Sequence, residues 1–257
     1  MRANRVKAAL QRGEVQVGTW VHTLAMPPVA RILATAGFDY VNIDMEHSAF
    51  SIETVAGLCA AALDVGVTPI VRPAGSDHHL VSRPLDNGAL GVLLPHVDTP
   101  SDARAALRSV KFPPDGDRGS QPPNVHTDYG PVDAPAYMQW SNEESLVMVQ
   151  IESEEALSAV DAILAVPGVD GAVVGRGDLS AALGVPGRRG DPAVLDAVDT
   201  MIAACKANNK VPGLLVQDID EAREWMARGI RYVTFSSEAA LLRTAGRRAV
   251  EAIRDGR

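Results

Sequence analysis

Residues 38–72 read FDYVNIDMEHSAFSIETVAGLCAAALDVGVTPIVR, and this stretch indicates the fold. Residues 39–44 and 68–72 are apolar runs of strand length, and residues 52–63 between them carry a helical pattern. Neither strand alternates between apolar and polar residues, which is typical of a parallel sheet buried on both faces. Pro69 fits at the beginning of its strand. The stretch therefore predicts two parallel strands joined by a helix.

The same alternation of strand and helix continues along the chain. Further strands are predicted at residues 15–20, 89–94, 146–151, 169–174, 213–216 and 232–235, with helical patterns between them. Eight such units match the number and size expected of a (β/α)8 TIM barrel, an α/β fold, and we expect residues 1–257 to form a single barrel domain. A doubly wound open sheet is the main alternative.

One long segment interrupts the alternation. Residues 111–135 are rich in Pro, Gly and Asp and show no periodicity. A loop of this length inside a compact domain usually has a function or carries an irregular insertion. We expect this segment, together with a neighbouring subunit, to shape one side of an active site.

Composition and cysteine content exclude several classes of protein. The formal net charge of −8 argues against a surface for nucleic acid or anionic membranes. Cys59 and Cys205 lie far apart within helical patterns, so we expect buried free thiols and no thiolate zinc site. The first residues lack the apolar core of a signal peptide, and no apolar run approaches the ~18 residues of a membrane span. We expect a cytoplasmic protein.

Charged and aromatic side chains follow several of the predicted strands. In a (β/α)8 barrel the active site forms where the carboxyl ends of the strands meet. The side chains concerned are Trp20 and His22 after the first strand, Asp44, Glu46 and His47 after the second, Arg72 after the third, Glu152 after the fifth and Asp178 after the sixth. We therefore predict an active site at this end of the barrel.

Glu152 and Asp178 are the predicted metal ligands. Two carboxylates from neighbouring strands supply hard oxygen ligands for a divalent cation such as Mg²⁺ or Mn²⁺ and leave positions for substrate and water. The alternative is that Glu152 caps the helix that begins near Ser153 and that Asp178 caps a short turn. Their matching positions at two strand ends favour the metal site.

Asp44 and His47 are predicted to form a pair in which the carboxylate fixes the imidazole tautomer and raises its basicity. Glu46 is an alternative partner for His47, and a solvated surface loop is the simpler alternative for the whole segment. Arg72 needs an anion, either a structural carboxylate or a substrate oxyanion. Trp20 is either a core or interface aromatic or a wall of the pocket.

Other polar motifs carry less information. His96 and His126 lack partners at a recognisable spacing, and we expect them only to shape access to the site. The glycines at positions 175 and 177 form neither a Gly-x-Gly-x-x-Gly motif nor a P-loop, which argues against a dinucleotide enzyme.

These features resemble the HpcH/HpaI-like class II pyruvate aldolases of the citrate lyase-like barrel superfamily, over nearly the whole chain. The motifs that carry the resemblance are Gly37-Phe38-Asp39, Asp44-Met45-Glu46-His47, Val71-Arg72-Pro73, Lys111-Phe112-Pro113-Pro114, Arg118-Gly119, Val149-Gln150-Ile151-Glu152, Val169-Asp170-Gly171, and Gly175 followed by Asp178-Leu179-Ser180. The resemblance implies a metal-dependent aldolase that reversibly cleaves 4-hydroxy-2-oxo acids to pyruvate and an aldehyde. The aldehyde side of its site is the side that we expect residues 111–135 and a neighbouring subunit to shape.

The resemblance also implies roles for individual residues. Glu152 and Asp178 would bind Mg²⁺, Mn²⁺ or Co²⁺, His47 would be the base with Asp44 as its partner, and Arg72 would stabilise the enolate. The remaining implied positions are Gln150 beside the metal, Trp20 beside the pocket, and a loop with Gly175, Gly177 and Asp178 that holds the substrate carboxylate through backbone N–H groups. Family members are commonly homohexamers, trimers of dimers that exchange the last helix, which is compatible with the long helix from Glu238.

One departure from the family pattern concerns the substrate. Arg176-Gly177 stands where a Pro-Ala pair is expected, and the added cation and freer backbone are expected to change which acid binds or to admit hydroxypyruvate as donor.

Alternatives to a pyruvate aldolase are a CoA-thioester lyase of the same superfamily and a non-catalytic oligomeric barrel. None of the lysines lies at a strand end, which disfavours a Schiff-base aldolase.

Overall fold

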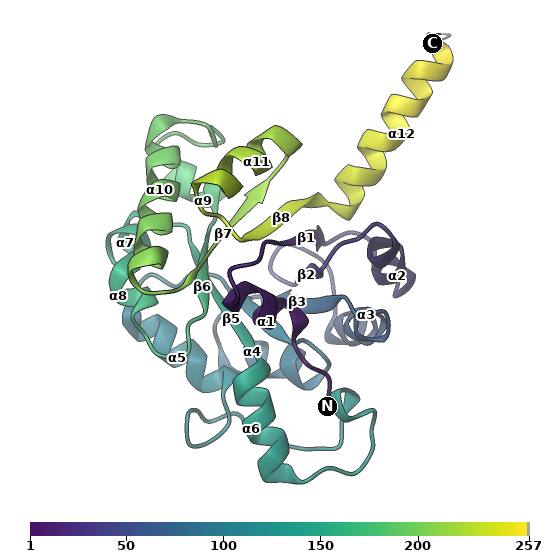
Figure 1. Ribbon diagram of the computed structural model, residues 1–257, viewed down its shortest axis with the longest axis vertical. Coiled ribbons are helices and arrows are strands. Elements are labelled where there is room, and N and C mark those ends of the chain that lie inside the picture. Colours follow the sequence, from purple (N-terminus) through teal and green to yellow (C-terminus); the bar gives the residue numbers. More distant parts are fainter. Residues whose placement is uncertain (256–257) are drawn as a thin grey trace.

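The computed structural model describes residues 1–255 and contains a closed barrel of parallel strands in the order β1 to β8 (Figure 1). The strands are β1 (Gln16–Val21), β2 (Tyr40–Asp44), β3 (Thr68–Arg72), β4 (Gly91–Leu94), β5 (Leu146–Ile151), β6 (Gly171–Val174), β7 (Val211–Val216) and β8 (Tyr232–Ser237). Each pairs in parallel with its neighbour in sequence, and β8 closes the barrel against β1. The predicted (β/α)8 barrel is confirmed, and the open sheet is excluded.

Helices surround the strands. They are α1 (Arg5–Gln11), α2 (Pro28–Thr35), α3 (Ile52–Asp64), α4 (His78–Asp86), α5 (Pro100–Val110), η1 (Val125–Thr127), α6 (Ala134–Glu144), α7 (Glu154–Ser158), α8 (Val160–Leu164), α9 (Arg176–Ala182), α10 (Pro192–Ala207), α11 (Ile219–Arg228) and α12 (Glu238–Arg254). The larger apolar core lies between strands and helices and includes Ile43, Leu58 and Cys59. Cys59 and Cys205 are buried and free, as predicted, and burial raises the pKa of both thiols. No helix within residues 1–255 has the length and apolarity that a membrane crossing requires.

The barrel interior is filled by aromatic and polar side chains. Tyr40 and Tyr232 stack with ring centroids 4.2 Å apart, and the Tyr232 hydroxyl donates a hydrogen bond of 2.6 Å to Asn42. Asn42 in turn donates to Thr234 at 3.0 Å. Gly18 makes this packing possible, since a Cβ atom there would lie 2.3 Å from the Tyr40 ring. Because buried polar groups are costly unless they are hydrogen-bonded, this network fixes the floor beneath the site.

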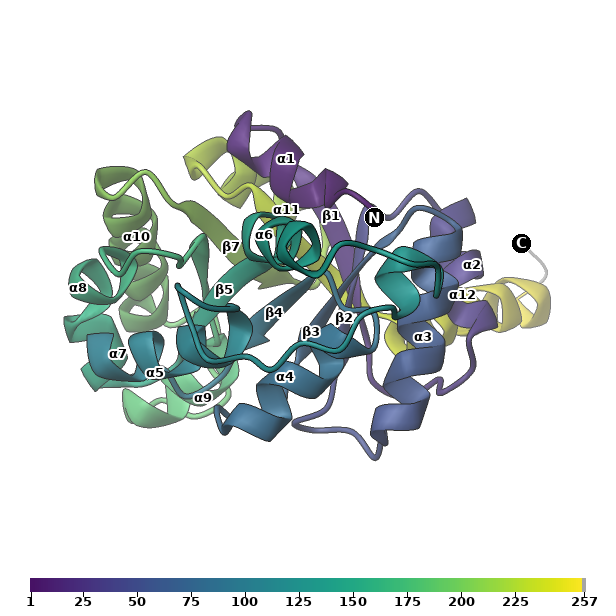
Figure 2. The same ribbon diagram turned by 90° about the horizontal axis from the view of Figure 1, so that it is seen from below.

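The interrupting segment lies at the opposite end of the barrel from the predicted site. Residues 111–133 are largely irregular, and they lead into α6, which the sequence analysis did not predict. The α6 helix runs directly into the first residue of β5, and the main chain at Glu144 and Ser145 accepts hydrogen bonds from Asn4 and Lys7 (Figure 2). The segment thus covers the amino-terminal end of the barrel. The expectation that it shapes the active site is wrong, because it follows α5, which returns the chain to that end.

The last helix projects away from the barrel (Figure 1). Glu238, its first residue, is the only buried residue of α12 in the described chain. Leu242 and Ile253 are 67% and 80% exposed. A helix in a protein gains most of its stability from packing of its apolar residues. The exposed apolar residues of α12 lack this packing in the described chain.

Candidate active site

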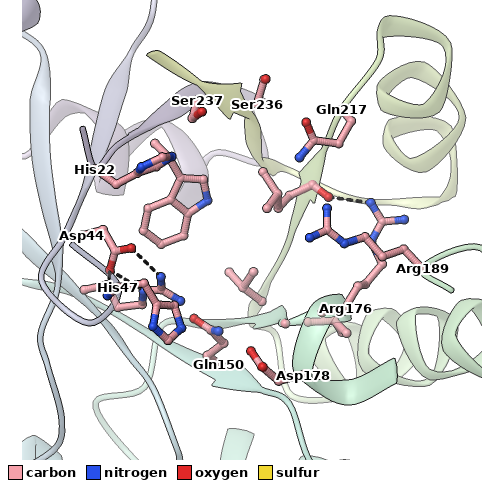
Figure 3. A pocket seen from close by; sticks show the side chains of 17 residues that line it. His22, Asp44, His47, Gln150, Arg176, Asp178, Arg189, Gln217, Ser236 and Ser237 are labelled. Atoms are coloured by element: carbon pink, nitrogen blue, oxygen red, sulfur yellow. Dashed lines mark hydrogen bonds and ion pairs between the residues drawn. The ribbon is translucent and has the colours of Figure 1, made fainter. Parts of the chain in front are cut away.

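A pocket of about 380 Å³ opens at the carboxyl ends of the strands (Figure 3). The predicted site residues that line it are Trp20, Asp44, His47, Arg72, Gln150, Gly175, Gly177 and Asp178. His22 lines it too. Glu152 does not line the pocket, but its carboxylate accepts a hydrogen bond from the Gln150 amide at 2.5 Å. The barrel therefore brings the predicted residues together, while their chemical roles stay predictions.

Arg72 is fixed by two carboxylates. Register places Asp44 opposite Arg72 on neighbouring strands, and the Asp44 carboxylate accepts hydrogen bonds from Arg72 Nε at 2.9 Å and Nη2 at 2.7 Å. Arg72 Nη1 lies 3.0 Å from Glu46 Oε2, close enough for an ion pair but outside hydrogen-bond geometry. The guanidinium also lies over the Trp20 ring, 4.5 Å from its centroid. All three charged side chains are at most 9% exposed, so this positive charge is buried and preorganised.

His47 is not paired with Asp44 in the structure. Besides Arg72, the Asp44 carboxylate accepts the backbone N–H groups of Glu46 and His47, at 3.0 and 3.4 Å. The His47 ring is 62% exposed, and its nearest acid is Glu46, with Nε2 3.7 Å from Oε2. The predicted Asp44–His47 side-chain pair is therefore replaced by an Asp44–Arg72 pair, because the two strands hold these residues side by side. Glu46 is the acid that faces His47.

His96 joins two buried carboxylates. Its backbone N–H donates to Glu152 Oε1 at 2.9 Å, and its ring Nδ1 lies 3.2 Å from the same oxygen. Ring Nε2 lies 2.8 Å from Glu46 Oε1. Burial raises the pKa of Glu152, partly offset by the His96 N–H group. The expectation that His96 only shapes access missed these contacts. The one sequence signal was its place after Pro95 at the end of a strand.

Asp178 lies in the first turn of α9, a helix that begins one residue after Gly175. The segment expected to be a loop is thus the start of a helix. No side chain within residues 1–255 forms a hydrogen bond or ion pair with the Asp178 carboxylate, which points into the pocket beside Gln150 (Figure 3). Gly175 lets the chain pass close to Glu152 just before α9, since a Cβ atom on Gly175 would lie 2.9 Å from Glu152 Oε2.

The donor atoms of the site fit a divalent cation. One oxygen of Glu46, one oxygen of Glu152 and a ring nitrogen of His96 lie within 4.8 Å of one another. Within residues 1–255, Glu46 Oε2 and Gln150 Oε1 are buried without a hydrogen-bond partner. Buried carboxylates here outnumber the guanidinium of Arg72, an imbalance that a bound cation would correct.

The side of the pocket formed by α9, β7 and β8 has a different character. Arg176 donates hydrogen bonds to Glu221 Oε1 at 2.6 Å and to the main-chain oxygen of Leu215 at 2.7 Å, and its side chain is 6% exposed. The cation that departs from the family pattern is therefore engaged with the protein and not available to a substrate. Arg189 also lines the pocket. Sequence reasoning missed Arg189, because it lies in a loop without a motif.

Comparisons with known proteins agree on one family. The model of the HpcH/HpaI aldolase/citrate lyase family matches residues 16–245. A hydroxypyruvate/pyruvate aldolase from Sagittula stellata is 36% identical over 242 residues, 94% of each chain. A 5-keto-4-deoxy-D-glucarate aldolase from Citrobacter koseri is 34% identical over 251 residues, 98% of this chain and 96% of the relative.

Solved structures give the same result. The HpcH/HpaI aldolase from Desulfitobacterium hafniense superposes with a TM-score of 0.91 at 33% identity, covering 96% of each chain. The citrate synthase SbnG superposes with a TM-score of 0.87 at 27% identity, covering 97% of this chain and 98% of the other. The chain therefore belongs to the HpcH/HpaI aldolase/citrate lyase family.

Proposed function

We propose that this protein is a class II pyruvate aldolase that reversibly cleaves 4-hydroxy-2-oxo acids to an aldehyde and pyruvate or hydroxypyruvate. Family membership and the names of relatives that are 34–36% identical support the reaction class. The observation that carries the proposal is the buried set of Arg72, Asp44 and Glu46, which His96 connects to Glu152, beside a pocket that Asp178 lines. We also propose that the protein is cytoplasmic, as expected from the sequence.

A divalent cation, Mg²⁺, Mn²⁺ or Co²⁺, is part of this function. Glu152 and Asp178 would hold it. Glu152 accepts a hydrogen bond from Gln150, which lines the pocket together with Asp178, and Glu46 and His96 lie close to Glu152 as further donors. When bound, the cation supplies Lewis-acid polarisation of the 2-oxo group. Carboxylate ligands suit these hard cations.

Side chains of the protein carry out the remaining steps of the proposed reaction, which are proton transfer and stabilisation of negative charge. His47 takes the proton of the C4 hydroxyl group, and its exposed ring is free to reach a substrate in the pocket. As the C3–C4 bond breaks, its electron pair moves toward the 2-oxo group and C4 becomes the aldehyde carbon. C3 then takes back the proton held by His47 to give the released 2-oxo acid. Arg72 stabilises the negative charge that develops there. Because Asp44 and Glu46 already hold the guanidinium, little reorganisation is needed during the reaction.

Two further elements form the part of the proposed site that binds the 2-oxo acid half of the substrate. The backbone at Gly175, Gly177 and Asp178 lines the pocket, and N–H groups in the first turn of a helix have no partner within the helix. We assign this backbone to the substrate carboxylate. Trp20 covers the Arg72 guanidinium and keeps water from one face of it.

The projecting helix is assigned to assembly. The exposed apolar residues of α12 would pack against a second copy of the chain, with α12 exchanged between partners and the dimers joined as a homohexamer. Size-exclusion chromatography with light scattering tests this: a mass of six chains is expected. Introducing a charge with Leu242→Glu should reduce the mass, whereas a monomeric wild-type protein would contradict the assignment.

A panel of 4-hydroxy-2-oxo acids tests the activity. Pyruvate and hydroxypyruvate release is followed by NMR with the protein supplied with Mn²⁺ or Mg²⁺. Release of either oxo acid from at least one member, at a rate that scales with protein concentration, is the expected result. Failure to cleave any member of the panel in the presence of each metal would overturn the proposal.

A further inference from the structure

A second cavity, of about 450 Å³, lies at the opposite end of the barrel from the proposed active site. It is bounded by the first residues of β5 and β7 and by the residues just before β6 and β8. Helix α1 forms another part of its wall, and α1 lies beside α6 at this end (Figure 2). The polar lining of this cavity, here called the basal cavity, consists of Lys7, Gln11, Asp170, Asn209, Lys210 and Arg231.

The basal cavity has more cationic than anionic side chains. Lys7, Lys210 and Arg231 line it, whereas Asp170 is its single carboxylate among the described residues. Asp170 Oδ2 accepts the Val147 N–H group at 2.8 Å and lies 3.1 Å from Lys7 Nζ. In the described part of the chain, Lys210 and Arg231 form no ion pair. The cavity is therefore locally positive, although the protein as a whole carries a formal net charge of −8.

Main-chain oxygens hold these three cations but use only some of their N–H donors. The amines of Lys7 and Lys210 each donate to one such oxygen, at 2.9 and 2.6 Å. Arg231 Nη1 donates to two, at 3.0 and 2.9 Å. An ammonium group has three donors and a guanidinium has five. Each lysine thus retains a donor, and Arg231 Nε and Nη2 have no acceptor within residues 1–255.

The three cations come from three elements that lie close together. Lys7 and Lys210 contact the consecutive residues Asp170 and Val169. Lys210 lies just before β7 and Arg231 just before β8, and these two strands are paired. A planar carboxylate presents its acceptors in one plane, whereas a phosphate group presents oxygens in several directions and carries up to two negative charges. Donors on three separate elements therefore match a phosphate group better than a carboxylate.

We propose that the basal cavity binds the phosphate group of a small molecule, either free phosphate or a phosphate monoester. The inference does not depend on the proposed aldolase function, because the cavity lies at the other end of the barrel. A bound phosphate would connect α1 to the beginnings of β7 and β8. Since a ligand that binds only the folded state stabilises it, the melting temperature should rise with phosphate concentration.

Isothermal titration calorimetry at constant ionic strength tests the site, with inorganic phosphate, glycerol phosphate and succinate as probes. Succinate is the dianion that has planar carboxylates. The expected result is binding of one molecule of inorganic phosphate or glycerol phosphate, with higher affinity than succinate. Binding of glycerol phosphate alone would support a site for monoesters, and binding of inorganic phosphate would support a site for the free ion. Failure of both phosphate probes to bind, or tighter binding of succinate, would overturn the inference.

Variants locate the bound phosphate. Lys210→Gln and Arg231→Gln should each lower the affinity by roughly tenfold to hundredfold, because each removes a charged donor. Gln11→Glu should also weaken binding, since it adds a like charge to the lining. Because the Gln11 side chain is exposed and forms no hydrogen bond within residues 1–255, this variant keeps the fold and tests the site even where a lysine or arginine variant is unstable.

Two control variants should keep the wild-type affinity. Lys206 is an exposed lysine in the last turn of α10 that does not line the basal cavity, so Lys206→Gln controls for loss of charge. Arg189→Gln removes a cation from the pocket at the other end. An equal loss in Lys206→Gln and Lys210→Gln would show attraction by overall charge. A loss in Arg189→Gln without one in Gln11→Glu would place the phosphate in the other pocket. Either result would overturn the inference.

Discussion

Asp44, Arg72 and Glu46 contact one another on one side of the pocket, whereas on the other side Arg189 and Gln217 form no side-chain hydrogen bond or ion pair within residues 1–255. Asp44 and Arg72 are buried and face each other through the register of β2 and β3, and Glu46 follows β2 with a side chain that is 9% exposed. The second group is exposed and is carried by a loop and a strand end. Buried, mutually paired charges hold one geometry without reorganisation, as bond cleavage requires. Exposed, unpaired charges remain available to a ligand, as selection among substrates requires.

This contrast predicts that variants on the acidic side abolish turnover and that variants on the opposite side, where Arg176 and Arg189 lie, change substrate preference or stability. Glu152→Gln should have the largest effect. Removing a charged metal ligand forfeits several kcal/mol of charge stabilisation, which corresponds to a rate loss of about a thousandfold or more. Metal content after gel filtration should fall with the rate. Glu154→Gln, an exposed residue in the first turn of α7, is the control and should retain both properties. Full turnover by Glu152→Gln would remove Glu152 from the metal site.

His47→Ala should follow, with a loss of about a hundredfold to ten-thousandfold in cleavage rate, because the variant lacks the proposed base. Metal binding should be unchanged, since His47 is neither of the proposed ligands Glu152 and Asp178 and also lies outside the group formed by Glu46, His96 and Glu152. His22→Ala is a matched control that also removes a pocket histidine. Comparable rates for the two variants would argue against a specific role for His47.

Arg72→Lys should lower kcat by about a hundredfold to a thousandfold, the usual effect of losing one donor to a developing negative charge. A lysine ammonium cannot reproduce the two parallel hydrogen bonds to Asp44 together with the ion pair to Glu46. Single-turnover measurements would separate the chemical step from binding. A kcat within threefold of wild type would show that a point charge suffices and that the fixed geometry is dispensable.

Arg176→Met should have the smallest effect on turnover, which we expect to stay within a few fold of wild type. The variant removes the guanidinium that donates to the Leu215 carbonyl and to Glu221 Oε1, so the free energy of unfolding should fall by about 1–3 kcal/mol. Urea unfolding measures this change. A stable variant with greatly reduced kcat/KM would instead make Arg176 part of the substrate site.

The sequence predicted most of the fold because the strands are short apolar runs bounded by Gly, Pro and charged residues. Helix α6 was missed for a physical reason. Only Tyr137 and Ser141 are buried on it, so it has no broad apolar face to reveal a helical period. Gly175 to Ser180 was expected to be a loop from the family resemblance, but Asp178 and Leu179 lie in the first turns of α9.

The composition of the site was predictable, but its contacts were not. Barrel topology alone places the residues that follow each strand at one end, and the pocket brings together residues from seven of the strands or their ends. Which acid meets which cation depends on strand register, and this pairs Asp44 with Arg72 in place of His47. The contacts of His96 depend on a backbone φ of 54°, which a sequence pattern does not reveal. Arg189 depends on the path of a loop.

Reversible metal removal tests the central claim most directly. Pyruvate release from a cleavable 4-hydroxy-2-oxo acid is measured before exhaustive EDTA treatment, after verified metal removal, and after addition of Mn²⁺, Mg²⁺ or Co²⁺. Loss of activity on removal and its return with at least one of these cations is the predicted result. Full activity in the verified metal-free protein would contradict the proposed mechanism.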